Sequence, residues 1–315
     1  MGLFPKNLTE YVALQGIPVG PNTNIYVVDP TSGSDSNPGT NWKAPLKTIA
    51  AAYAKCTANQ HDTVLALAAA DGHTLSAALT WSKNLTHLIG LCAPSRIAQR
   101  ARIFQLSTLT GASPLILVSG SGCIFKDLYV FQGVADATSL INVKVTGGRN
   151  WFKNVHFAGG GNALHAINNG ASLMLDGCEE NLFDKCTIGV DTIGGGDGFV
   201  GLLLDGGAKR NEFKNCRFRM EAAHTGASFV EVADATAITH DHIFDNCIFT
   251  NNSSTVTMAS AFLIAAVSTG GRLLAKDCMF NRVSKLDAND RHVLYGNMGA
   301  ITGADGSGVA VELIT

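Results

Sequence analysis

The chain has 315 residues and a formal net charge of −2, with 15% charged and 46% hydrophobic residues. This composition excludes intrinsic disorder, which needs few apolar residues and a high net charge. It also excludes a coiled coil, which would be rich in charged helix formers. A charge near zero gives no electrostatic basis for binding nucleic acid. No stretch approaches the ~18 apolar residues of a membrane span. Low charge on a folded chain favours a surface that is covered by assembly.

The chain begins with two segments that differ from the rest. Residues 1–24 carry no repeat, and we expect either a docking arm or an ordered extension. Residues 25–61 are typical of a cap, with a strand from Ile25, a loop rich in Gly, Ser, Asp and Asn, and a helix with Pro45 near its first turn. Such a helix can cover the open end of a repeat protein. Its predicted apolar stripe consists of Leu46, Ile49, Ala50 and Tyr53.

Six segments of the same pattern follow, and they start at Phe125, Phe152, Phe183, Phe213, Phe244 and Ala275. Each has an apolar residue or Cys at its fourth and sixth positions, which is strand periodicity. The first position also points inward but is three residues from the fourth, so the chain must turn a corner between them. Asn and Asp tolerate the left-handed conformation that such a corner needs. The predicted corner residues are Asp127, Asn154, Asn215, Asn246 and Asp277.

A second apolar strand lies between consecutive segments, so each repeat holds three short strands and no helix. One such repeat of ~30 residues cannot bury its inward face alone, whereas stacked repeats can. The sequence therefore predicts an all-β fold, a right-handed parallel β-helix over residues 62–295. Residues 296–315 would be a C-terminal strand or tail.

Equivalent side chains of stacked coils lie ~4.8 Å apart, which predicts two interior ladders. Their residues are Cys186, Cys216, Cys247 and Cys278, with Phe218, Phe249 and Phe280. A free Cys behaves as a small buried hydrophobe, and no CxxC pair marks a zinc site. We expect no metal and no cofactor.

Asp176, Asp205 and Asp234 are spaced 29 residues apart, at the ends of equivalent strands. Two interpretations stay open. Stacked carboxylates would raise at least one pKa and would supply the carboxyl pair of a glycoside hydrolase, ~5 Å or ~6.5–9.5 Å apart. Alternatively, Asp-Gly is an ordinary turn dipeptide. We favour the turn and expect no catalytic residue; if the chain is an enzyme, these three aspartates are the candidates.

Two further motifs are weaker. Asp191 and Asp197 flank a Gly-rich loop that loosely resembles a substrate or cation loop. His240 and His242 alternate, so they would share one face of an extended strand and could hold a metal. No third ligand is evident beside them, and a solvated turn is the simpler interpretation.

The segment VDPTSGSDSNPGT, followed by PLKTIAAA, resembles the first part of pectin-lyase-like right-handed β-helix proteins, and the later coils carry the same Asn-corner repeat. The likeness covers residues 25–282. NLTHLIGLCAPSRIAQRARIF, from Asn84, is similar to short phage-encoded members. The superfamily includes polysaccharide lyases and hydrolases, phage tailspikes and non-catalytic virion proteins. The motifs of polygalacturonases and pectate lyases are not found as such.

The resemblance implies a phage virion protein. Because no complete catalytic motif is found, we expect a non-enzymatic, capsid-decorating or cementing homotrimer. Its partner would be the major capsid protein or another virion protein, and it would assemble in the cytoplasm of the bacterial host. The alternative is a tailspike-like protein that binds or depolymerises a host surface glycan as a hydrolase or lyase. Neither function needs nucleic acid or a membrane.

Overall fold

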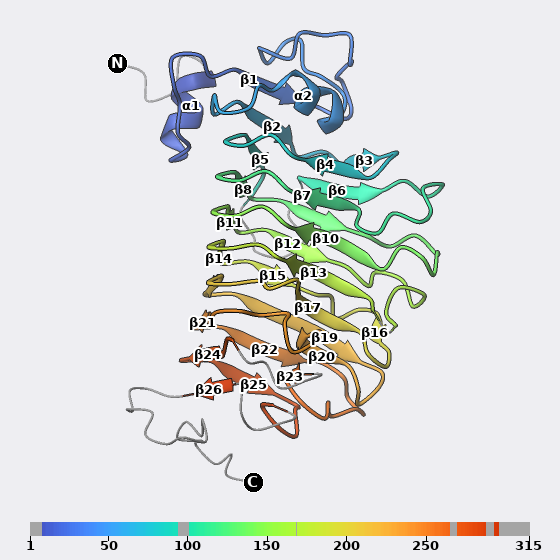
Figure 1. The fold of residues 1–315 in the computed structure, drawn as a ribbon. Helices are drawn as coiled ribbons and strands as arrows, with labels where there is room; N and C mark the ends of the chain where they lie inside the picture. The colour runs from blue at the N-terminus through green and yellow to red at the C-terminus, as the bar shows by residue number, and fades with distance from the viewer. Residues whose placement is uncertain (1–7, 94–100, 168, 265–269, 288–292, 296–315) are drawn as a thin grey trace.

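The computed structural model describes residues 8–93, 101–167, 169–264, 270–287 and 293–295. The chain coils into an elongated solenoid whose strands stack from the N-terminal to the C-terminal end (Figure 1). All strand pairs in the described residues are parallel and successive coils add strands to the same three sheets, so the predicted parallel β-helix is confirmed. Helix α1 spans Leu8–Leu14 and helix α2 spans Ile49–Lys55.

The three sheets are named A, B and C. Sheet A contains β1 (Ile25–Val28), β2 (Thr63–Leu67), β5 (His87–Leu91), β8 (Ile124–Lys126), β11 (Trp151–Lys153), β14 (Leu182–Asp184), β18 (Glu212–Lys214), β21 (His242–Asp245), β24 (Leu273–Lys276) and β26 (Val293–Tyr295). Sheet B contains β3 (His73–Leu75), β6 (Arg102–Gln105), β9 (Tyr129–Phe131), β12 (His156–Ala158), β15 (Thr187–Ile188), β16 (Gly194–Gly195), β19 (Arg217–Ala222), β22 (Ile248–Asn251) and β25 (Met279–Asn281). Sheet C contains β4 (Leu79–Trp81), β7 (Ile116–Val118), β10 (Ile141–Val145), β13 (Ala171–Asp176), β17 (Val200–Asp205), β20 (Ser228–Val232) and β23 (Phe262–Ile264).

The N-terminal segments differ in detail from the prediction. Helix α2 begins after Thr48, whose side chain accepts a hydrogen bond from the Ala51 amide, so Pro45 lies before the helix. Ala50 is exposed and Ala52 is buried instead, because helical spacing places residues three and four positions after Ile49 on its face. β1 pairs with β2 and is therefore the first strand of sheet A.

Helix α1 lies within the predicted arm and packs on the outside of sheet A. Its Val12 is buried against an apolar cluster formed by Ile17, Ile25, Leu65, Ile89 and Ile124. Residues 8–24 are thus an ordered extension on the solenoid surface. The first seven residues and the predicted C-terminal segment 296–315 lie outside the described residues.

The corner residues between sheets A and B all adopt left-handed backbone conformations. Asp127, Asn154, Asn215, Asn246 and Asp277 have φ between 52° and 56°. Lys185 has φ 56° at the same position of its coil, so the corner imposes this conformation even on a residue that does not favour it. Side chains also bridge coils, since Asn154 Nδ2 donates to Asp127 Oδ1 at 2.6 Å.

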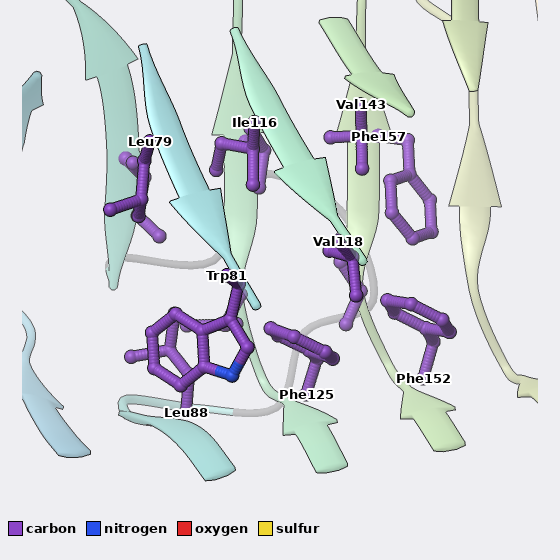
Figure 2. Close-up of a pocket in the computed structure, with 13 residues that line it drawn as sticks. Leu79, Trp81, Leu88, Ile116, Val118, Phe125, Val143, Phe152 and Phe157 are labelled. Carbon is purple, nitrogen blue, oxygen red and sulfur yellow. The ribbon is translucent and has the colours of Figure 1, made fainter. Parts of the chain in front are cut away.

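The interior is filled by columns of stacked side chains. Phe152, Phe183 and Phe213 stack face to face with ring centroids 4.7 Å apart, and Phe218, Phe249 and Phe280 form a second column. Figure 2 shows the N-terminal end of this core, where Trp81 and Phe125 join the stack. The cavity there holds only about 20 Å³ and is lined by apolar side chains, so it is packing space and not a ligand site.

The cysteine column lies beside the aromatic ones. Cys186, Cys216 and Cys247 are completely buried, and Cys278 nearly so. Each thiol donates to a carbonyl of the preceding coil, as Cys216 Sγ does to Phe183 O at 3.2 Å. Burial raises the pKa of the Cys216 thiol well above its usual range, and none of the eight cysteines, all within the described ranges, forms a disulfide.

The cysteine column predicts a strong response to a buried charge. Cys216→Asp should lower the free energy of unfolding by more than about 3 kcal/mol, because no described side chain offers the new carboxylate a countercharge there. Cys216→Ala is the control and should cost only about 1 kcal/mol. Chemical denaturation measures both. Equal stability of the two variants would contradict an inward position for Cys216.

Three buried histidines predict a pH dependence of stability. Burial lowers the pKa of His87 to about 3 and those of His156 and His242 to about 4, from 6.5. They stay neutral in the folded protein while the unfolded chain takes up protons below 6.5. Stability should therefore be complete above pH 6.5 and fall towards pH 4, by about 1.4 kcal/mol per pH unit for each histidine.

The control for this prediction is His242→Asn. His242 occupies the column in which the preceding coil has Asn211, so the substitution keeps a side chain that the column already accepts. The variant should lose the contribution of one histidine, about 1.4 kcal/mol per pH unit, from the pH dependence between pH 6.5 and 4.5. Thermal unfolding across that range measures it, and an unchanged slope would show that His242 does not titrate on unfolding.

Candidate functional site

The outer face of sheet C carries two rows of side chains that alternate with buried ones. Leu202 and Leu204 point into the core, so Leu203 points outward between them. The first outward row, which follows the solenoid axis, consists of Leu117, Lys144, Met174, Leu203, Glu231 and Leu263. The second row contains Asp176 and Asp205. This face is the part of the molecule where the predicted aspartates come together.

Asp176 and Asp205 are direct register partners on β13 and β17, which places their backbones about one strand spacing, ~4.8 Å, apart. Asp176 Oδ2 lies 2.5 Å from Lys144 Nζ. Asp205 Oδ1 accepts the amide of Gly206 at 2.7 Å. The lysine compensates one of the two neighbouring negative charges and leaves the other uncompensated.

Gly206 makes room for this pair. Its φ is +61°, and a Cβ at this position would lie 1.9 Å from Asp176 Oδ1. Gly177, after Asp176, is also left-handed, with φ +65°. The Asp-Gly dipeptides therefore form turns, as the simpler interpretation held, and they also bring the two carboxylates onto one face.

Asp234 does not join them. Leu204 pairs with Val232, so Ala233 and not Asp234 stands in register with Asp205. Asp234 lies after the end of β20 in an exposed turn, where its Oδ1 accepts from the Thr236 amide and hydroxyl at 2.7 and 2.8 Å. Its hydrogen bonds with Thr236 lower its pKa. Asp234 therefore fits the favoured turn interpretation, and the alternative of a three-residue ladder does not extend to it, because strand register and not sequence spacing aligns the coils.

Glu231 is the carboxylate that β20 brings to this face, in the row of Leu203 and not in that of Asp205. It lies on the outer face one strand beyond Asp205, opposite Leu203 and Leu263. Burial raises the pKa of Glu231, and the nearby negative charge of Asp205 raises it further. The alternation of Val230 and Val232, both buried, was the available signal that Glu231 points outward.

The other candidate motifs form separate contacts. Asp191 accepts hydrogen bonds from Arg219 and Asn252, and Asp197 Oδ1 lies 3.0 Å from His224 Nδ1. His240 is exposed while His242 faces the core, so the two do not share a face. Within the described part of the chain, no three His, Cys, Asp or Glu residues are grouped so that they could hold a metal ion.

No helix in the described ranges has the length and apolar character needed to cross a membrane. No protein-family model and no curated protein sequence matches the chain. Solved structures do match. A pectin methylesterase in complex with a hexasaccharide is 16% identical, with a TM-score of 0.56 over 93% of this chain and 94% of that chain. The deglycosylated pectin methylesterase from Aspergillus niger is 13% identical, with a TM-score of 0.55 over 92% and 89%.

A more distant likeness is to tailspike protein 2 of the Escherichia coli O157:H7 bacteriophage CAB120, at 8% identity and a TM-score of 0.41 over 79% of this chain and 40% of that chain. At these identities a structural match establishes the fold and not the activity. The chain has the right-handed parallel β-helix fold of these structures.

Proposed function

We propose that this protein binds a polysaccharide along the outer face of sheet C and hydrolyses it, with Glu231 as general acid and Asp205 as general base. The observation that carries the proposal is the pairing of a half-buried glutamate, whose pKa is raised, with a neighbouring aspartate on one open face. Two carboxyl groups in unlike environments are the arrangement that divides into acid and base.

The spacing of the pair favours inversion of the sugar's configuration. Glu231 is one strand beyond Asp205 and two residues back along the strand direction. Strand spacing and rise together give a backbone separation of ~8 Å. Side chains that leave the same face in parallel keep about this separation between their carboxyl groups, and ~6.5–9.5 Å is the range that leaves room for a water molecule. Asp205 would take a proton from that water as its oxygen bonds to the anomeric carbon, while Glu231 protonates the departing oxygen.

The same face supplies binding surface. Met174, Leu203 and Leu263 form a partly exposed apolar row on either side of the acid. From β7 to β23 the face is five strand spacings long, about 24 Å, which suits an extended chain. The matching pectin methylesterase was solved with a hexasaccharide, so a β-helix of this type can accommodate one.

This proposal predicts that removing a carboxylate from the outer face of sheet C slows hydrolysis, whereas removing one from a turn does not. Asp205→Asn and Glu231→Gln should each lower the rate of hydrolysis at least ~100-fold, because each removes a proton-transfer group. Asp234→Asn is the matched control and should leave the rate unchanged, since Asp234 lies in a turn off the face. The assay measures new reducing ends released from purified host surface polysaccharides.

Thermal unfolding of the three variants verifies that the fold is intact. Absence of hydrolysis by the wild-type chain on the polysaccharides of its own host would contradict the proposal. So would full activity in Glu231→Gln.

We also propose that the protein is part of a phage particle, as the sequence resemblance implies. The supporting observation is an exposed apolar patch at the N-terminal end. Leu14 and Trp42 are 73% and 48% exposed, and Tyr11 on the same helix meets the edge of the Trp42 ring at a centroid distance of 6.2 Å. Exposed apolar side chains that gather at one end of a folded protein favour an interaction there.

Attachment through this patch predicts that the chain co-sediments with phage particles from its host in a density gradient. Replacing Leu14 and Trp42 by Ser should remove it from the particle fraction without changing its thermal unfolding, because both side chains are exposed. Ile248→Ser, an exposed apolar residue on sheet B, is the control. Particles that lack the wild-type chain would contradict the attachment.

A further inference from the structure

The outer face of sheet B carries a cluster of aromatic side chains near its N-terminal end. Arg102 and Phe104 lie on β6, and Tyr129 and Phe131 are their register partners on β9. Ile103 and Val130, between them, are buried in the core, so these four side chains point outward. We call Arg102, Phe104, Tyr129 and Phe131 the aromatic platform.

Arg102 lies across all three rings of the platform. Its guanidinium carbon is 4.8 Å from the Phe131 ring centroid, 5.2 Å from that of Tyr129 and 5.7 Å from that of Phe104. Arg102 forms no ion pair with any described residue. The platform therefore presents an exposed positive charge that is held in place by ring faces and is free to meet an anion.

Glycines in three neighbouring loops leave the space that the rings occupy. A Cβ at Gly133 would lie 2.3 Å from the Phe131 ring, and one at Gly161 would lie 2.5 Å from the same ring. At Gly72 a Cβ would meet the Phe104 ring at 3.0 Å. The ring positions thus depend on the absence of side chains at three separate points of the chain.

Three members of the platform, Arg102, Phe104 and Phe131, line a surface groove of about 670 Å³. Asp71, Ser107 and Asn162 line it as well, and they offer hydrogen-bond partners for hydroxyl groups. Gln105 also lines it, and its Oε1 has no hydrogen-bond donor among the described residues, although its Nε2 donates to Leu109 O and Ser139 Oγ. Aromatic walls, a few polar groups and a cation that forms no ion pair within the described ranges suit a ligand with an apolar face, hydroxyl groups and a negative charge.

We propose that the aromatic platform is a second glycan-binding site, separate from sheet C, that binds uronate-type sugars. The sugar ring would pack in the groove beside Phe104 and Phe131, and its carboxylate would meet the Arg102 guanidinium, which suits planar bidentate pairing. The site lies on a different sheet from Asp205 and Glu231, so it holds a chain and does not cleave it. It does not depend on the hydrolysis proposed for sheet C.

The test is calorimetric titration with tetramers of galacturonate, glucuronate and mannuronate, and with carboxyl-reduced forms of each. The protein is the full chain carrying Glu231→Gln, so that the probes stay intact. At least one uronate tetramer should bind, and Phe131→Ala should weaken it about tenfold. Gly133→Ala should act like Phe131→Ala, because it displaces the ring without removing it.

Variants of Arg102 separate the contribution of charge to tetramer affinity from the contribution of shape. Arg102→Gln should weaken the uronate tetramer to the affinity of its carboxyl-reduced form, and Arg102→Lys should restore part of the loss. Ile248→Ala, exposed on the same sheet, is the control and should bind as the parent does. Equal binding of acidic and reduced tetramers would overturn the carboxylate assignment.

Failure of every tetramer to bind, or unchanged affinity in Phe131→Ala, would overturn the site itself. Because turnover is measured separately on the chain with Glu231 intact, loss of this site and loss of hydrolysis are distinguishable. A Phe131→Ala variant that still hydrolyses polysaccharide but no longer binds the tetramer would support both proposals at once.

Discussion

Coil-on-coil stacking in register is the constraint on which the rest of this molecule depends. It requires that every coil turn between sheets A and B at the same point, and a single left-handed residue sets that point from Asp127 to Asp277. With the corner fixed, inward residues form continuous columns, and outward residues form straight rows at the strand spacing of ~4.8 Å. Both proposed binding faces are rows of this kind.

The inward columns explain residues that have no role on the surface. Phe183 and Phe213 stack because they occupy one column, and the cysteines fill a neighbouring column where each thiol reaches a carbonyl of the coil before. A further column holds Asn150, Asn181 and Asn211, whose Oδ1 atoms accept backbone amides of the preceding coils at 2.8–3.0 Å. Buried polar groups of this kind persist only when they are hydrogen-bonded.

The sequence allowed residues to be placed correctly where the number of residues between an inward position and its corner is the same in every coil. The corner residues and the two ladders could be placed from the six aligned segments, because no insertion falls within them. Asn150, Asn181 and Asn211 each precede the first Phe of their aligned segment by two residues, and this regularity also predicts their column. The strands of sheet C follow loops of varying length, so equal spacing in sequence did not mean equal register there.

Asp234 and Glu231 illustrate this limit. A spacing of 29 residues aligned Asp234 with Asp205, whereas the buried pairs of Leu202 with Val230 and Leu204 with Val232 set the register at 28. The aromatic platform was not foreseen, because Phe104 lies before the aligned segments and its neighbours come from a second coil. Surface rows of this kind are created by stacking and leave little trace in a single repeat.

A carbon-13 NMR titration of the Glu231 carboxyl group tests the proposed acid most directly. The account predicts a midpoint above the ordinary 4.5 and a decrease in Asp205→Asn, because burial and the Asp205 charge both raise the pKa of Glu231. It also predicts no change in Asp234→Asn. A midpoint at or below 4.5 that is insensitive to Asp205→Asn would contradict the assignment of Glu231 as the acid on sheet C.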